Sequence, residues 1–340
     1  MPQAPWTVTP SEETMRIVFI GTGGIARSHA DGLVKRSDVT FAGAYDAAPE
    51  RAQSFVRQYG GTAYASLEEM LDAVKPDAAW VCIPPFAHGE PELALAERRI
   101  PFLVEKPIAN SMDVARRILD SVQRTGTLAA AAYMTRYRRS VNRVREVLAA
   151  DPALLVQGGW IGGTPGVPWW RVKAQSGGQI VEQTTHTFDL VRYLVGEPRT
   201  VYAYGARGFV TDLPGYDVED ASAVAIQFES GAVGSLVSCC GSTAGGGVHL
   251  TLAARKHFIS FTGWEHTAVI RRSSLEEEQI RGEPNIFELE DAAFIEAVRT
   301  GNAELVRSPY ADALKTLAFC LAANRSLETG QPVEVATLGG

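Results

Sequence analysis

A glycine-rich segment near the start of the chain is the first whose residue types and spacing could do chemistry. It is Gly21-Thr22-Gly23-Gly24-Ile25-Ala26, and it follows an apolar run at residues 17–20. Glycine at 21 permits a tight turn, glycine at 23 lets the backbone approach a pyrophosphate, and the small Ala26 allows close packing of helix and strand. N–H groups at the start of the following helix would face the phosphates. Many glycine-rich turns only connect two elements, but the strand before this one and the helix after it favour dinucleotide binding.

Asp46 ends a second predicted strand, 20 residues after Ala26. A carboxylate at this place can accept hydrogen bonds from the hydroxyls of an adenosine ribose, and it would repel a 2′-phosphate. The pattern therefore predicts NAD in preference to NADP, although Arg51 lies nearby and could soften the discrimination. The alternative is that Asp46 only caps the helix that Pro49 begins.

A second motif, Glu105-Lys106-Pro107, follows the predicted strand at residues 101–104. Open parallel sheets bind ligands at the carboxyl ends of their strands, so this motif should face the cofactor crevice. A lysine beside a nicotinamide could polarise a carbonyl or stabilise an alkoxide. Elsewhere in a fold the same tripeptide would more often be a surface turn.

A third motif runs from Gly177 to Leu190. If it is one helix, Glu182, His186 and Asp189 stand at positions i, i+4 and i+7 and share a polar face. A histidine held between carboxylates is a plausible proton acceptor near neutral pH, because negative charge supports its protonated form. The alternative is a structural, hydrogen-bonded histidine at a domain boundary.

The hydrophobic pattern predicts the framework that must position these motifs. Up to about residue 150, apolar runs alternate with helical periodicity, which is typical of a parallel sheet with helices on both faces. The expected strands are residues 17–20, 39–45, 78–83 and 101–104, and the expected helices are residues 25–35, 49–59, 67–74, 90–99 and 114–125. A capping box at Ser66 to Glu69 should start the third helix.

Beyond about residue 150 the period changes to the alternation of antiparallel strands. Residues 224–228 and 233–237 flank a Ser230-Gly231 turn, and further strands are expected over 201–209 and 248–261, with helices over 290–300 and 311–329. The length of 340 residues also favours two domains. We place the boundary between residues 125 and 150, and expect an arm at 1–14, an α/β doubly wound domain at 15–135 and an α+β domain at 136–340.

Composition excludes several classes of function. The chain has 39 acidic and 32 basic residues and a net charge of −7, so it offers no basic field for nucleic acid or anionic lipid. Its four cysteines lack the spacing of a zinc site or a disulfide framework, and we expect no bound metal. No apolar run approaches the ~20 residues of a membrane helix, and the first fourteen residues lack the order of a secretory signal. We therefore expect a cytoplasmic protein.

Taken in order, these motifs resemble the Gfo/Idh/MocA family of sugar and cyclitol oxidoreductases. The resemblance covers residues 15–335 and includes the glycine loop, Val81-Cys82-Ile83-Pro84-Pro85 with His88, Glu105-Lys106-Pro107, Tyr133-Met134-Thr135-Arg136-Tyr137, residues 177–189 and the hairpin around Gly231. The glycine loop is shared with many families. The ordered combination is specific to this one.

The resemblance implies a Rossmann domain and an α+β domain with a large, mainly antiparallel open sheet, whose free face commonly mediates homodimers or homotetramers. It implies hydride transfer between NAD(P) and a secondary hydroxyl or ketone of a sugar, cyclitol or related polyol. By the resemblance Lys106 is the lysine of the Glu-Lys-Pro motif, His186 is the general acid/base, and Glu182 stands where the family most often has aspartate. We expect Lys106 to stabilise the negative oxygen, with Glu182 and Asp189 orienting His186 or holding substrate.

Other residues are predicted to border the two ligands. Beside the cofactor we expect Ile83, Pro84, Pro85, His88 and Glu105, with His88 closing its loop rather than transferring a proton. Beside the substrate we expect Trp160, Trp170, Arg171 and Lys173, and also Tyr133 and Arg136, because aromatic faces stack on sugar rings and cations bind hydroxyls or carboxylates. The structural alternatives are buried tryptophans and solvated cations. We expect His29 to help the first helix pack or to meet solvent.

Other functions stay open on the same fold. One is an NAD-dependent enzyme that cleaves glycosides through a transient ketone, and another is a keto-sugar reductase. A catalytically silent, nucleotide-dependent regulatory protein is a third, but the presence of Lys106 and His186 counts against it. All enzymatic versions require that the Lys106 ammonium and the His186 imidazole converge beside the nicotinamide.

Overall fold

The computed structural model describes residues 14–339, which form two compact units. The first unit contains residues 14–109, 113–134 and 285–312, and the second contains residues 110–112, 135–284 and 313–339. The arm expected over residues 1–14 lies, except for its last residue, outside the described part of the chain. Residues 285–312 differ from the sequence prediction, which placed them in the second domain.

Within the described residues, the first unit is built on a six-stranded parallel sheet in the order β3-β2-β1-β4-β5-β6. Its strands are β1 (Met15–Ile20), β2 (Val39–Tyr45), β3 (Thr62–Ala63), β4 (Ala78–Val81), β5 (Phe102–Val104) and β6 (Ala129–Ala131). The order turns back beside β1, so the carboxyl ends of β1 and β4 flank the crevice where doubly wound sheets bind ligands. The predicted α/β class is confirmed.

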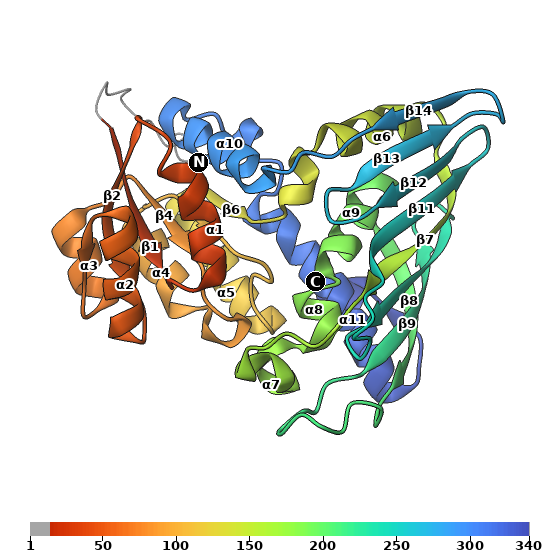
Figure 1. Ribbon diagram of the computed structural model, residues 1–340, viewed down its shortest axis with the longest axis horizontal. Helices are drawn as coiled ribbons and strands as arrows, with labels where there is room; N and C mark the ends of the chain where they lie inside the picture. The colour runs from red at the N-terminus through yellow and green to blue at the C-terminus, as the bar shows by residue number, and fades with distance from the viewer. Residues whose placement is uncertain (1–13, 340) are drawn as a thin grey trace. The chain divides into compact units, whose positions relative to one another are not determined.

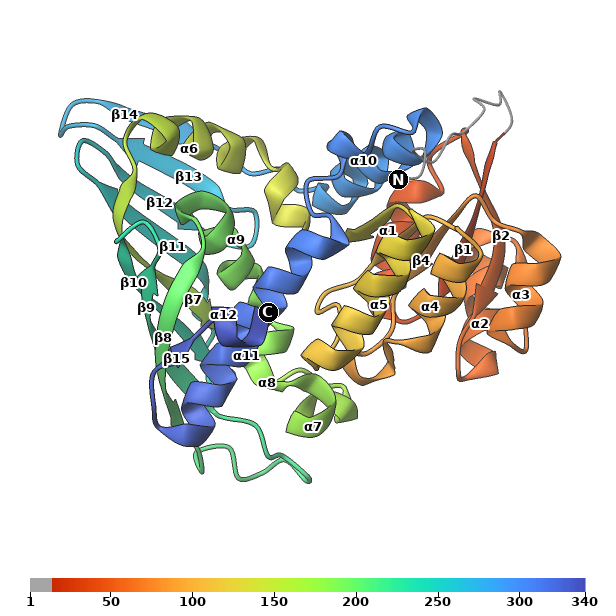
Figure 2. The ribbon, with the colours of Figure 1, turned by 180° about the vertical axis from the view of Figure 1, so that it is seen from behind.

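Helices cover both faces of this sheet (Figures 1 and 2). They are α1 (Gly24–Leu33), α2 (Pro49–Tyr59), α3 (Leu67–Val74), α4 (Glu90–Glu97), α5 (Met112–Thr125) and α10 (Ile286–Thr300). Local signals set several of their ends. The Ser66 Oγ accepts the Glu69 N–H at 3.1 Å at the start of α3, as the capping box predicts, and Gly126 adopts φ 72° just after α5.

The core of the first unit is an aromatic cluster between the sheet and helices α1, α2 and α10. The ring centroid of Phe19 lies 4.9 Å from that of Phe55 and 5.8 Å from that of Trp80. Trp80 in turn meets Phe294 of α10 edge to face at 5.4 Å. Burial of each such side chain contributes roughly 1.5–3 kcal/mol. This packing places α10 in the first unit, although its sequence neighbours belong to the second.

The second unit contains a nine-stranded, mainly antiparallel sheet among the described residues, in the order β14-β13-β12-β11-β7-β10-β9-β8-β15. The strands are β7 (Ala153–Ile161), β8 (Pro198–Ala206), β9 (Ala221–Phe228), β10 (Val233–Cys239), β11 (Gly247–Ala254), β12 (Phe258–Thr262), β13 (Thr267–Arg271), β14 (Glu277–Ile280) and β15 (Val333–Glu334). β10 pairs in parallel with β7. The single strand predicted over 248–261 is a hairpin of β11 and β12, closed by the Ala254 N–H to His257 carbonyl bond of 2.9 Å.

Helices of the second unit gather on one face of the large sheet (Figures 1 and 2). They are α6 (Arg139–Ala150), α7 (Lys173–Ser176), α8 (Gly178–Glu182), α9 (Thr185–Val195), α11 (Tyr310–Thr329) and α12 (Ala336–Gly339). On the other face, Ala223, Ala225 and Gln227 of β9 are exposed in the single chain. The sheet is therefore open on that face, as the fold prediction requires.

Candidate functional site

The glycine loop joins β1 to α1 and leaves open space above its backbone. Gly21 has φ 82°, and a Cβ there would lie 2.3 Å from the Cys82 carbonyl oxygen, so only glycine fits. At Gly23 and Gly24 a Cβ would meet nothing within 4 Å. The first turn of α1 carries no acidic residue and its N-cap Gly23 offers no side-chain cap. Its N–H groups can therefore donate hydrogen bonds to a phosphate.

Asp46 connects the end of β2 to this loop. Its Oδ2 accepts the Thr22 N–H at 2.8 Å and the Thr22 hydroxyl at 2.9 Å, while its Oδ1 accepts the Ala48 N–H at 2.9 Å. The residue at the N-cap of α2 is Ala48, so Asp46 is not itself the cap. An open glycine loop with a half-buried carboxylate at the end of β2 fits a dinucleotide. Residues 21–26 and Asp46 would hold it.

The Glu-Lys-Pro motif follows β5, at the same sheet edge. Glu105 is buried, and its Oε2 accepts the backbone N–H of Lys106 at 2.9 Å. Along this edge Ile83 and Pro84 are half-buried and Pro85 is buried. These positions are compatible with the predicted cofactor border, which stays a prediction.

His88 lies just before α4, next to its N-cap residue Gly89. Its Nδ1 is 2.6 Å from Glu92 Oε1, and the other oxygen of Glu92 accepts the Gly89 N–H at 2.8 Å. These bonds hold the loop closed, which is the role that the sequence favoured for His88. Contact between His88 and the cofactor stays a prediction.

The third motif is not one helix. α8 ends at Glu182 and α9 begins at Thr185. Between them the N–H groups of Gln183 and Thr184 both donate to the Gln179 carbonyl, at 3.0 and 2.8 Å, which interrupts the regular helical pattern. The continuous polar face expected over residues 182–189 is therefore wrong, and Glu182 and His186 lie on different helices.

Within the second unit, His186 packs against two indole rings, which also contact each other with centroids 5.4 Å apart. The imidazole centroid is 6.2 Å from Trp160 of β7, nearly parallel to it, and 5.6 Å from Trp264, perpendicular to it. Trp264 lies in the β12–β13 turn and is 40% exposed, so part of its ring is available to a ligand. Sequence reasoning missed Trp264 because no motif surrounds it. A tryptophan placed in a tight turn after Gly263 was the available signal.

Buried polar groups hold the Trp264 turn. The Trp264 carbonyl accepts hydrogen bonds from Arg138 Nη2 at 3.0 Å and from His266 Nδ1 at 2.9 Å. Burial, with the nearby Arg138 charge, lowers the pKa of His266 to about 4, so its ring is neutral near pH 7. The position of the Trp264 ring is thus set by its backbone rather than by surface contacts.

Glu182 is fixed by a tryptophan. The buried Trp170 donates its indole N–H to Glu182 Oε2 at 2.6 Å. This bond orients the carboxylate at the end of α8. A role of either residue in holding substrate stays a prediction.

Arg136 and Asp189 form a buried, two-pronged ion pair. Arg136 Nε donates to Asp189 Oδ2 at 2.8 Å and Nη2 donates to Oδ1 at 2.5 Å. The Thr316 hydroxyl of α11 adds a bond to Oδ1 at 2.8 Å. These contacts give the pair a structural role, and a substrate role for either side chain stays a prediction. Tyr133 is also buried.

Lys173 precedes Gly177 and has a charged side-chain partner. Lys173 Nζ and Arg207 both donate to Glu219 Oε1. Burial opposes the ionisation of Glu219, but these bonds outweigh it and lower its pKa. The backbone carbonyl of Arg171 accepts the Asp217 N–H at 3.0 Å. Substrate contacts of Arg171 and Lys173 stay predictions.

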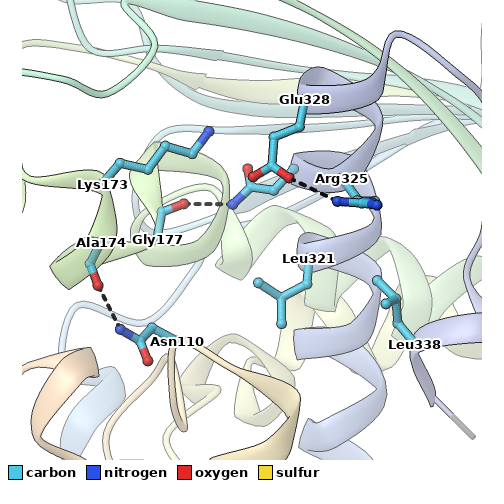
Figure 3. Close-up of a pocket in the computed structure, with 9 residues that line it drawn as sticks. Asn110, Lys173, Ala174, Gly177, Leu321, Arg325, Glu328 and Leu338 are labelled. Carbon is cyan, nitrogen blue, oxygen red and sulfur yellow. Dashed lines mark hydrogen bonds and ion pairs between the residues drawn. The ribbon is translucent and has the colours of Figure 1, made fainter.

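A pocket of about 360 Å³ lies between α7, α11 and α12 (Figure 3). Asn110 donates to the Ala174 carbonyl at 3.0 Å and Asn324 donates to the Gly177 carbonyl at 2.7 Å at its wall. Its lining comprises Asn110, Lys173, Ala174, Gly177, Leu321, Asn324, Arg325, Glu328 and Leu338. Of the predicted substrate residues, this lining includes Lys173.

The described residues contain neither a cluster suited to a metal ion nor a helix suited to span a membrane. Over residues 14–339, no group of three or more His, Cys, Asp or Glu side chains is arranged to hold a metal ion. In the same part of the chain, every helix is too short or too polar to cross a bilayer.

Two family models match the chain. The model described as "Oxidoreductase family, NAD-binding Rossmann fold" matches residues 15–133, and the "GFO/IDH/MocA C-terminal domain" model matches residues 154–259. Both matches fall on the units described above.

Individual relatives agree with these models. Glucose-6-phosphate 3-dehydrogenase of Bacillus subtilis (strain 168) is 32% identical over 39% of this chain and only 37% of its own length. scyllo-Inositol 2-dehydrogenase (NAD(+)) of the same organism is 24% identical over 95% of this chain and 97% of its own. Levoglucosan dehydrogenase, solved in complex with NADH and L-sorbose, superposes with a TM-score of 0.85 at 19% identity, covering 95% of this chain and 99% of that one.

Proposed function

Because the chain belongs to the Gfo/Idh/MocA family of NAD(P)-dependent oxidoreductases, we propose that it transfers hydride between NAD and a secondary hydroxyl, or the matching ketone, of a cyclic sugar, cyclitol or related polyol. The family and the NAD(P)-binding fold are the premise, and the substrate class is the proposal. The names of its relatives, which act on glucose 6-phosphate and inositol, support that class.

The observation that carries the proposal is the cluster of His186 with Trp160 and Trp264. Indole faces stack on the C–H faces of sugar and cyclitol rings, and they present little competing charge. An imidazole beside them can accept the proton of a ring hydroxyl. A cyclic polyol satisfies both groups at once.

In this proposal each side chain has a separate role in the reaction. His186 takes the hydroxyl proton, and Lys106 donates to the oxygen on which negative charge develops. NAD, when bound, accepts the hydride from the carbon that carries this oxygen. Glu182, oriented by Trp170, accepts a hydrogen bond from a further hydroxyl of the substrate.

A substrate screen tests this function. The purified chain is incubated with monosaccharides, inositols and sugar acids, each with NAD and with NADP, and formation of reduced cofactor is followed by absorbance. Net NADH formation with a cyclic polyol is expected. Release of an aglycone from a glycoside without net NADH would instead favour the glycoside-cleaving alternative and contradict the dehydrogenase.

The cofactor preference can be altered at Asp46. Asp46→Asn removes the charge that repels a 2′-phosphate but keeps an oxygen that can accept from Thr22, so the ratio of kcat/KM for NAD over NADP is expected to fall about tenfold, equivalent to ~1.4 kcal/mol. Steady-state kinetics with both cofactors measures the ratio. Arg51→Ala should move it the opposite way. An unchanged ratio in Asp46→Asn would remove Asp46 from cofactor selection.

The aromatic pair predicts a change in KM. Trp264→Ala removes one stacking surface, so KM for the best cyclic substrate is expected to rise up to about tenfold, from the 0.5–1.5 kcal/mol of such contacts, with kcat little changed. Phe209→Ala, which removes an aromatic ring that is 81% exposed in the same unit, is the control. If KM is the same in both variants, stacking on Trp264 is excluded.

We also propose that two copies associate through the open face of the large sheet. Paired strands present uncharged side chains there, as the register of Val233 with Gln227 and Leu155 and of Ser235 with Ala225 and Gln157 indicates. The central strands β7, β9 and β10 are uncharged on this face, as the buried core of a homodimer interface usually is, while Arg271 and Glu277 lie toward the β14 edge.

A further inference from the structure

A histidine lies between two carboxylates inside the first unit. His29 of α1 has Nδ1 at 2.8 Å from Asp291 Oδ1 of α10 and Nε2 at 3.1 Å from Glu105 Oε1 after β5. The side chains of His29, Glu105 and Asp291 are 0%, 5% and 1% exposed. Of the two alternatives expected from sequence, His29 packs inside the fold and does not meet solvent, and the sequence did not predict its two carboxylate partners.

The geometry requires an imidazolium. A neutral imidazole has one N–H, so one ring nitrogen would point its lone pair at a carboxylate oxygen. Burial alone would lower the pKa of His29, but the charges and hydrogen bonds of Asp291 and Glu105 outweigh it and raise the pKa well above its ordinary value. The contacts of both ring nitrogens and the raised pKa of His29 together favour the doubly protonated ring.

Other side chains contact the imidazole ring or its carboxylate partners. Trp80 of β4 donates its indole N–H to Asp291 Oδ1 at 2.8 Å, and the Phe287 ring meets the imidazole edge at 5.2 Å. Burial, followed by the charges of Glu105 and Asp291, raises the pKa of the Cys82 thiol, which keeps it uncharged. Glu105 and Asp291 are thus the charged partners of His29 in this core.

Glu105 belongs both to this cluster and to the Glu-Lys-Pro motif. One carboxylate oxygen faces His29 and the other accepts the backbone N–H of Lys106 at 2.9 Å. Both oxygens are therefore fixed. A rotation of the Glu105 carboxylate would release the Lys106 backbone at the point where its side chain leaves the sheet edge.

We propose that His29 is a positioning residue for the reaction: its imidazolium locks the Glu105 carboxylate, and that carboxylate locks the backbone of Lys106. This inference rests on the proposed function, in which Lys106 meets the reacting oxygen. Because α1 also begins at the glycine loop, His29 connects the cofactor-binding helix to the catalytic lysine.

Three variants separate positioning from stability. His29→Leu leaves two carboxylates facing each other in a dry core and is expected to destabilise the fold. In His29→Gln with Asp291→Asn, the amide can still donate to Glu105 and the net charge of the cluster stays −1. Glu105→Gln removes the negative charge through which the second member of the connection holds the imidazolium. Tyr59→Phe is the control, since it removes a 2.7 Å bond to Asp31 of the same helix α1, with no link to Lys106.

The kinetic result expected is a loss of kcat with little change in NAD affinity. Per folded molecule, His29→Leu and Glu105→Gln each lower kcat by tenfold or more, and their combination loses no more than either alone, because both act through one connection. The His29→Gln, Asp291→Asn pair recovers most of kcat, and Tyr59→Phe keeps it. Full kcat in folded His29→Leu, or additive losses in the combination, would overturn the proposal.

A second measurement needs no substrate, so it distinguishes failure of the positioning role from failure of the proposed function. NMR of the ring nitrogens should show His29 doubly protonated at about pH 8, where an ordinary histidine is neutral, and Glu105→Gln should remove this protonation. A neutral His29 ring in the wild-type chain overturns the positioning role. Absence of turnover with every polyol, beside a protonated His29, instead rejects the substrate class.

Discussion

His186→Asn is expected to lower kcat by about 10²–10⁴-fold, the usual contribution of a general base. Asparagine is smaller than histidine and keeps a polar group beside Trp160 and Trp264, but it accepts no proton near neutral pH. The residues that would hold the cofactor belong to the other unit, so the Kd of NAD should change by less than about threefold. Steady-state turnover and quenching of protein fluorescence by NAD measure the two quantities.

Lys106→Met should lower kcat by about 10²–10³-fold, because it removes the donor to the developing oxyanion. Lys106→Arg keeps the charge but not the compact ammonium, so it should recover little. The combination of Lys106→Met and His186→Asn should lose less than the product of the single losses, since in the proposed scheme the two groups act on one hydroxyl. A variant that retains full turnover would remove its residue from the scheme.

Local signals explain how much of the fold could be predicted. The 39–45 strand and the 49–59 helix occur at the expected residues, and Ser66 caps α3. Each depends on neighbours within a few positions: a proline at the first helical turn, a hydroxyl that reaches an N–H three residues on, an apolar run of strand length. The glycine loop was predictable for the same reason, because its glycines, the strand before it and the helix after it are adjacent in sequence. The contact that requires glycine at 21, with the Cys82 carbonyl, is long-range.

Long-range contacts explain what could not be predicted. The periodicity of residues 286–300 indicates that one face of this helix is buried. It does not indicate that Phe294 contacts Trp80 of the first unit. Likewise, His29 and Asp291 are 262 positions apart, so no spacing rule joins them. The break between α8 and α9 was missed because the helical pattern of residues 178–190 continues through a shift in hydrogen bonding at Thr184.

Asp189→Ala is expected to cost about 3–5 kcal/mol of stability, because it leaves the Arg136 guanidinium buried without its counter-charge. Both side chains are at most 2% exposed, and the guanidinium also lies 4.7 Å from the centre of the Tyr193 ring. That ring supplies only a weak substitute for a carboxylate. The loss should appear as a drop of several degrees in the thermal midpoint, measured by calorimetry on the intact chain.

A charge-free replacement tests the reason for this loss. Arg136→Met with Asp189→Leu removes both charges and keeps apolar volume, so it should recover most of the midpoint that Asp189→Ala loses. Arg271→Ala is the matched control, because it breaks the Arg271 pair with Glu277, whose side chains are 53% and 48% exposed, and such surface pairs contribute about 1 kcal/mol or less. If Asp189→Ala and Arg271→Ala shift the midpoint equally, the buried pair is not what stabilises the junction of α9 and α11. If the apolar pair stays folded with normal turnover, Arg136 and Asp189 act on structure alone and their predicted contact with substrate is excluded.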